Sequence, residues 1–164
     1  MQYEEYRDFL RLLRSKAEPI QGFRWGKAHL RPLIDPFGDR IGWQLTALVG
    51  VFLSDKHFVR FKEHWKETSQ GQFERGFFSY HYGPYEDQWI LETVRAKKVI
   101  VRVDASDYEG RGYHIHDGGK QRRIFQEDLV SPDLSKMAID GFFDSVVKIR
   151  RGQNVEKAYK LKFR

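Results

Sequence analysis

Residues 113–119 read Tyr-His-Ile-His-Asp-Gly-Gly, and this stretch decides how the fold is interpreted. Strict alternation of side-chain type predicts a β-strand with Tyr113 and Ile115 on one face of the sheet. His114 and His116 then share the other face, and the Asp-Gly-Gly that follows favours a sharp turn. We therefore expect two imidazoles on the open face of a strand, where they can act as an acid/base pair or as two metal ligands.

A second alternating strand precedes it at residues 99–104, which read Val-Ile-Val-Arg-Val-Asp. Arg102 and Asp104 share one face of this strand. If the two strands form an antiparallel hairpin with its turn centred near Tyr108, Arg102 lies opposite His114, and opposed residues point to the same face. The pattern predicts that a cation, a carboxylate and two histidines meet on one solvent-accessible surface.

The centre of the chain is a series of short alternating segments separated by turn residues. These segments lie at residues 43–53, 58–65, 73–82, 89–94, 97–104 and 113–116. The connections between them are too short for crossover helices, so the sheet should be mainly antiparallel.

Helices are predicted at both ends of this sheet. Residues 3–16 repeat apolar side chains at helical spacing, and Pro19 ends any continuation. The Ser-Pro-Asp at residues 131–133 is typical of a helix start, and the apolar stripe at residues 134–149 suits a helix that covers one sheet face. The sequence thus predicts an α+β fold, with a mainly antiparallel β-sheet of about five or six strands and an N-terminal helix and a C-terminal helix packed on it.

Length and composition indicate one soluble domain. A chain of 164 residues with 15% aromatic residues can build a packed core. We expect a single α+β domain over residues 1–150, in which residues 1–40 form a helix plus an irregular arm that binds a partner or plugs the core. The chain has no cysteine, which excludes disulfides and zinc–cysteine sites. With no window near the roughly 18 apolar residues of a membrane span and no signal peptide, we expect a cytoplasmic protein without a membrane partner.

The positive charge is concentrated near the end of the chain. The net charge is +6, and residues 148–164 carry seven basic side chains against one acid, Glu156. We interpret residues 151–164 as a basic C-terminal tail on a nearly neutral body. Such a tail either binds phosphate groups or only aids solubility.

The histidine pair has three functional interpretations. In a metal-free ribonuclease, one imidazole removes the 2′-hydroxyl proton, another protonates the leaving oxygen, and Arg102 stabilises the phosphorane. In a metal-dependent nuclease of the HUH type, a His-hydrophobic-His motif holds a cation and a tyrosine attacks, for which Tyr159 lies downstream. A structural metal site is the third, although no four-ligand spacing appears. The alternative to all three is a pair of exposed histidines without a function.

The strand at residues 77–82 adds a second candidate element. There His81 lies between two tyrosines, and such a histidine can orient a phosphate or stack on a base. The alternative is an aromatic-rich core strand, an interpretation that is stronger for Tyr80 and Tyr82. The candidate catalytic residues are His81, Arg102, His114 and His116. The candidate nucleic-acid-binding residues are Tyr80, Tyr82, Asp104, Arg111, Arg122, Arg123, Arg150, Arg151 and Lys160. We predict no metal and no cofactor, and the expected partner is RNA or another nucleic acid.

These motifs, taken in order, resemble the TumE-like family of small toxins from prokaryotic toxin–antitoxin modules. The matching elements are Phe-Phe-Ser-Tyr-His-Tyr at 77–82, Val-Arg-Val-Asp at 101–104, His-Ile-His-Asp-Gly-Gly at 114–119 and Ser-Pro at 131–132. The resemblance covers about residues 45–149 and implies RNA cleavage or another translation-blocking action, neutralised by a protein antitoxin. The expected function is therefore that of a toxin-like, RNA-directed protein, a small ribonuclease that uses the histidine pair and the arginine. A non-catalytic nucleic-acid-binding accessory module and an HUH-type single-stranded DNA nuclease are the alternatives.

Overall fold

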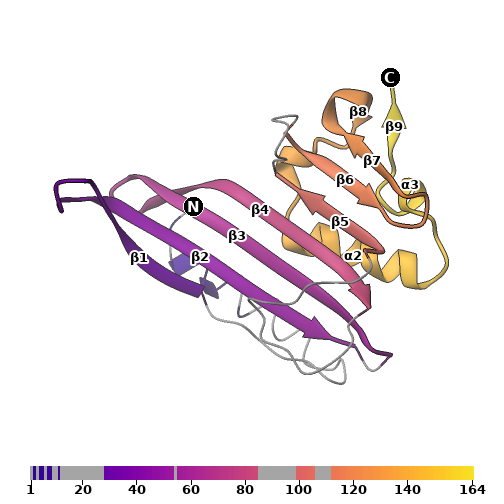
Figure 1. The fold of residues 1–164 in the computed structure, drawn as a ribbon, viewed down its shortest axis with the longest axis horizontal. Coiled ribbons are helices and arrows are strands. Elements are labelled where there is room, and N and C mark those ends of the chain that lie inside the picture. Colours follow the sequence, from indigo (N-terminus) through magenta and orange to yellow (C-terminus); the bar gives the residue numbers. More distant parts are fainter. Residues whose placement is uncertain are drawn as a thin grey trace.

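The computed structural model describes residues 28–53, 55–84, 99–105 and 112–164, together with Gln2, Glu4, Glu5, Arg7, Asp8 and Arg11 (Figure 1). Most of the predicted helix at residues 3–16 lies outside the described residues. So do the predicted strand at 89–94, the turn expected near Tyr108, and Arg111.

The main element is a seven-stranded sheet in which each strand pairs antiparallel with the next one along the chain. Its strands are β1 (Ala28–Ile34), β2 (Arg40–Phe52), β3 (His57–Ser69), β4 (Gln72–Pro84), β5 (Val101–Asp104), β6 (His114–Asp117) and β7 (Arg122–Phe125). The mainly antiparallel sheet of the predicted α+β fold is confirmed, with more strands than expected.

One extra strand, β1, falls in the stretch predicted to be an irregular arm. The prediction was based on the many glycine, proline, arginine and aromatic residues of this stretch, and Pro32 among them lies opposite Trp43 of β2. Because β1 is an edge strand, a proline costs it no hydrogen bond to a further neighbour. The turn to β2 is held by the Asp35 side chain, which accepts hydrogen bonds from the backbone N–H groups of Phe37 and Asp39, each at 2.9 Å.

The helix α2 (Ile139–Arg150) packs on one face of the sheet, as predicted for the C-terminal helix. Figure 1 shows it beside the short strands, at the end of the sheet away from the β1–β2 turn. The Phe142 ring lies 6.0 Å from that of Phe61 and 5.5 Å from that of Tyr80, measured between centroids. These aromatic contacts place the core between α2 and strands β3 and β4.

The start of this helix was predicted too early. The chain at Ser131 still forms β8 (Leu129–Ser131), and Asp133 caps only the short 3₁₀-helix η2 (Leu134–Lys136) through the N–H of Ser135. Arg75 donates a hydrogen bond of 2.8 Å to the carbonyl of Ser135, which ties η2 to β4. The capping residues predicted from the sequence therefore serve a separate turn, and α2 begins at Ile139 without a side-chain cap.

The predicted basic tail is folded. It forms α3 (Val155–Ala158) and β9 (Lys162–Phe163), and β9 pairs with β8. Val155, Ala158 and Tyr159 are buried in the core. The remaining short element is the 3₁₀-helix η1 (Gln126–Asp128), which joins β7 to β8. Within the described residues, no helix is both long enough and apolar enough to cross a membrane.

Candidate functional site

Strands β5 and β6 bring the predicted residues together in a register that differs from the expected one. Arg102 lies opposite His116, and Asp104 lies opposite His114, whereas we predicted that Arg102 would face His114. The shift is two residues, so every side chain keeps its predicted face. The N–H of Gly118 donates a 3.0 Å hydrogen bond to the carbonyl of Ile100, which extends the same register by one residue pair.

Arg102, Asp104, His114 and His116 form a tight cluster, which we call the histidine cluster. Arg102 donates from Nε to Oδ2 of Asp104 at 2.6 Å and from Nη2 to Nε2 of His116 at 2.8 Å. The Nε2 atoms of the two histidines are 2.9 Å apart. Oδ2 of Asp104 lies 3.3 Å from Nε2 of His116 and 3.6 Å from Nε2 of His114. Each of these three residues thus directs one electron-rich atom to the same point.

The protonation pattern of the cluster follows from its partners. Nδ1 of His114 lies 2.9 Å from the carbonyl oxygen of Gly112, which only accepts, so this nitrogen carries a proton. Neutral His114 therefore has its lone pair on Nε2. Arginine has no acceptor, so Nε2 of His116 receives the Arg102 hydrogen bond on a lone pair as well. Two imidazole nitrogens and a carboxylate oxygen thus converge, and such an arrangement can hold a shared cation.

Exposure separates the two histidines, and this corrects the prediction that both lie on an open surface. His114 is only 1% exposed, since the Phe125 ring of β7 lies 5.4 Å from it. The side chains of His116 and Arg102 keep 16% and 33% of their area accessible. His116 and Arg102 are therefore accessible to solvent, whereas His114 and Asp104 are buried.

The charge of Asp104 is stabilised by its neighbours. Burial on its own raises the pKa of this carboxyl, but its side-chain contacts with His116 and Ser79 and the charge of Arg102 outweigh it, so the pKa lies below its ordinary value. An ionised Asp104 keeps Arg102 and His116 oriented. The sequence pattern predicted that this carboxylate shares a face with both histidines, although Asp104 was assigned to the nucleic-acid contacts.

The face that carries the cluster also carries a line of arginine and histidine side chains, one from each of strands β3 to β7. Its members, each directly opposite the next, are Arg60, His81, Arg102, His116 and Arg123. We call these residues the cross-strand row. It crosses the sheet on the face opposite α2, and three of its five members are arginines.

Within this row, His81 is a buried and neutral imidazole. It is 3% exposed, and it stacks on Phe58 with centroids 5.2 Å apart. Burial, followed by the charges of Arg60 and Arg102, lowers the pKa of His81 to about 3. Its Nε2 has no hydrogen-bond partner within the described part of the chain. His81 is therefore unsuited to donate a proton at neutral pH.

Tyr80 and Tyr82 lie on the other face, under α2, and leave no ring surface for a base. The Tyr80 hydroxyl donates to the carboxylate of Glu63 and accepts from Nη1 of Arg75 at 2.8 Å. The Tyr82 hydroxyl accepts from Arg150 at 3.2 Å. These rings are core and network residues, and the alternation that put His81 on the site face also put the tyrosines away from it.

The other predicted nucleic-acid contacts are divided between the two sides of the sheet. Arg123 is exposed and lies opposite His116. Arg122 instead forms ion pairs with Glu156 and with Asp117. Arg150 binds Asp55 at 2.8 Å, while Arg151 and Lys160 are exposed without a role in the cluster. Only Arg123 among these residues extends the cross-strand row.

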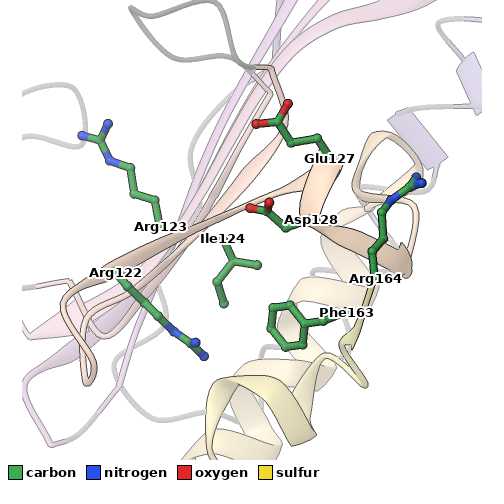
Figure 2. A pocket seen from close by; sticks show the side chains of 7 residues that line it. All are labelled: Arg122, Arg123, Ile124, Glu127, Asp128, Phe163 and Arg164. Atoms are coloured by element: carbon green, nitrogen blue, oxygen red, sulfur yellow. The ribbon is translucent and has the colours of Figure 1, made fainter.

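A separate pocket of about 570 Å³ lies between β7, η1 and β9. It is lined by Arg122, Arg123, Ile124, Glu127, Asp128, Phe163 and Arg164. Figure 2 shows the Phe163 ring facing Ile124 across this pocket, with Arg122 reaching toward Phe163. Residues distant in sequence build it, so sequence reasoning had no signal for it. Its lining combines acidic and basic side chains and includes no residue of the histidine cluster.

The tyrosine required by the HUH interpretation is inaccessible. Tyr159 is 5% exposed, and burial raises the pKa of its hydroxyl well above the ordinary value. An attacking tyrosine needs the opposite environment, one that is open to substrate and favours the phenolate.

No family model, curated protein or solved structure shows significant similarity to this chain. The resemblance to the TumE-like toxins therefore stays a prediction based on short motifs.

Proposed function

We propose that the protein is a toxin-like, RNA-directed protein that cleaves phosphodiester bonds at the histidine cluster. The observation that carries this proposal is the double hydrogen bond of Arg102, which holds Asp104 with Nε and the partly exposed His116 with Nη2. A guanidinium fixed beside an accessible imidazole is a combination that suits acid/base chemistry on a phosphate.

The chemistry begins when a substrate phosphate attracts Arg102 away from His116. This frees the lone pair on Nε2 of His116, which takes the proton of the ribose 2′-hydroxyl. The 2′-oxygen then bonds to phosphorus, and the bond from phosphorus to the 5′-oxygen breaks, leaving a 2′,3′-cyclic phosphate. A water molecule protonates the departing 5′-oxygen, and the hydroxide that remains takes the proton from the His116 imidazolium, while Arg102 stabilises the charge on the phosphorane. His114 and Asp104 act as positioning residues for His116.

Substrate binding is supported by the cross-strand row. Arg123 lies opposite His116 on the strand beyond it, and Arg60 and His81 continue the row on the other side of Arg102. A non-catalytic RNA-binding module would use the same row, so this second function differs from the first only in whether a bond is broken.

The deciding experiment incubates purified protein with labelled RNA and with labelled single-stranded DNA, each with and without EDTA. RNA cleavage that survives EDTA, yields a cyclic phosphate end and is lost in His116→Ala supports the proposal. His64→Ala is the matched control, since His64 is a half-buried histidine of β3 that contacts Phe77 outside the cluster. Binding without cleavage would replace the nuclease by the accessory module, and EDTA-sensitive nicking of DNA would restore the HUH interpretation.

The proposal also predicts an effect on cell growth and a protein partner that relieves it. A toxin-like nuclease should arrest growth when it is expressed alone, and a cognate antitoxin should relieve the arrest. Wild-type protein and the His116→Ala variant should differ in growth at equal expression levels. Equal growth with both would contradict the toxin-like action.

A further inference from the structure

We propose that Asp104, His114 and His116 form a binding site for one divalent transition-metal ion of the zinc class. One ligand atom from each residue lies within 4.8 Å of the other two. Imidazole nitrogen and carboxylate oxygen are ligands that zinc accepts. Metal binding at these atoms does not require that the protein cleave RNA, so the two proposals stand separately.

The distances between the ligand atoms fit a single ion. A tetrahedral ion with bonds of about 2.0–2.1 Å keeps its ligand atoms about 3.3–3.4 Å apart. The three separations here are 2.9, 3.3 and 3.6 Å. Shifts of a few tenths of an ångström therefore suffice to place all three atoms around one metal.

The tautomer of His114 is already the one that a metal requires. Its Nδ1–H donates to the carbonyl of Gly112, which leaves Nε2 free to bind a cation. A second hydrogen bond of this kind, from the far ring nitrogen to a backbone carbonyl, is the usual support of a metal-bound histidine. The ligands are also rigid, because Asp104 and His114 are buried and directly opposed on β5 and β6.

Three protein ligands leave one coordination position open. His116 is the most exposed of the three, so the open position is accessible from the side where Arg102 lies. A site with three ligands and an open position can take a water molecule or an anionic oxygen as the fourth ligand. This differs from closed structural zinc sites, in which the protein supplies all four ligands.

Arg102 competes with the metal for the same atoms. It donates to Oδ2 of Asp104 and to Nε2 of His116, which are two of the three ligand atoms. Its positive charge also opposes the approach of a cation. Since one third of the Arg102 side chain is accessible, it can turn outward when a metal binds. Removal of this side chain should therefore strengthen metal binding, which a merely structural arginine would not do.

The test uses untagged full-length protein stripped of metal by a chelator and then titrated with zinc sulfate against a chromophoric zinc indicator. We expect one zinc ion per chain in the wild type and in His64→Ala, and loss of this binding in His116→Ala and Asp104→Asn. Arg102→Ala should bind zinc about tenfold or more tightly than the wild type, because a charge-assisted hydrogen bond no longer competes. Cobalt(II) should give the intense visible bands of a tetrahedral site in the wild type.

The test remains decisive even if one of the variants fails to fold. Circular dichroism selects variants that retain the wild-type spectrum, and the cobalt spectrum needs no variant at all. Zinc binding that persists unchanged in His116→Ala, or a cobalt spectrum of an octahedral aqua ion, would overturn the site. A chain that binds zinc but never cleaves RNA keeps this site and loses the nuclease proposal, and cleavage without zinc binding gives the reverse result.

Discussion

His114 and His116 bring their Nε2 atoms to 2.9 Å from each other, although only His116 is accessible to solvent. The two imidazoles are therefore not equivalent. His114 is held by its backbone partner and by the neighbouring Phe125 ring, and His116 is held by Arg102. A buried imidazole that orients an exposed one is a positioning device, and its loss should be felt in stability as well as in activity.

Replacement of each histidine in turn should separate the structural role of His114 from the chemical role of His116. His116→Ala should lower RNA cleavage by about 10²–10⁴-fold, as expected for loss of a general base. Its free energy of unfolding should change by less than about 1 kcal/mol because the side chain is partly exposed. His114→Ala should lower the free energy of unfolding by about 1–3 kcal/mol, since it opens a cavity and leaves the Gly112 carbonyl without its donor. Urea unfolding and cleavage assays on both variants measure the difference, and equal losses of stability would contradict it.

Gly118 should tolerate no side chain. A Cβ at this position would lie 1.7 Å from the carbonyl oxygen of Val99, so Gly118→Ala must displace backbone atoms. We expect a loss of about 3 kcal/mol in the free energy of unfolding, and a loss of activity because β5 and β6 shift relative to each other. Gly76→Ala is the matched control in β4, where a Cβ meets nothing within 4 Å. Thermal melts of both variants check this, and a Gly118→Ala protein as stable as Gly76→Ala would disprove the close approach.

His81 should make the protein sensitive to acid. Its folded-state pKa is about 3, whereas an unfolded histidine titrates near 6.5. Between these two values the unfolded chain binds more protons, so the free energy of unfolding falls as the pH falls, by up to about 1.4 kcal/mol per pH unit. His81→Phe retains an aromatic ring for the stack with Phe58 and removes the titrating group.

Urea unfolding at several values between about pH 4 and pH 7 tests this prediction. The free energy of unfolding of His81→Phe should change less with pH than that of the wild type. Parallel curves for the two proteins would show that another group causes the acid sensitivity.

Arg123 should contribute to RNA binding through its position at the end of the cross-strand row. Arg123→Gln should weaken binding at low salt and reduce the slope of log affinity against log salt by about 0.7, the value for one phosphate contact with a single strand. Arg151→Gln is the control, because Arg151 is equally exposed but caps α2 on the other side of the sheet. Fluorescence anisotropy at several salt concentrations measures both slopes. A larger effect at Arg151 would place the binding surface on the helix side.

The amino-acid sequence by itself determined which face each strand residue occupies. The alternation at residues 101–104 and 114–117 is a local property with a period of two, so it placed Arg102, Asp104, His114 and His116 together before any pairing was known. The antiparallel sheet and the C-terminal helix followed from equally local patterns. The same alternation was enough to predict that an arginine, a carboxylate and two histidines form the cluster.

Register, burial and partner choice were decided only by the tertiary structure. Arg102 meets His116 in a register in which Gly118 also packs closely against Val99 and Ile100, a contact that no periodicity encodes. His114 is buried because Phe125 of β7 packs beside it. Tyr80 is a core residue and not a surface contact, because α2 covers the face on which it lies. The lysines and arginines of residues 151–164 indicated a tail, yet the apolar residues between them pack under α2 and beside β8. Side-chain type and spacing act along the chain, whereas burial depends on which distant segment covers a surface, and that is settled only when the whole chain packs.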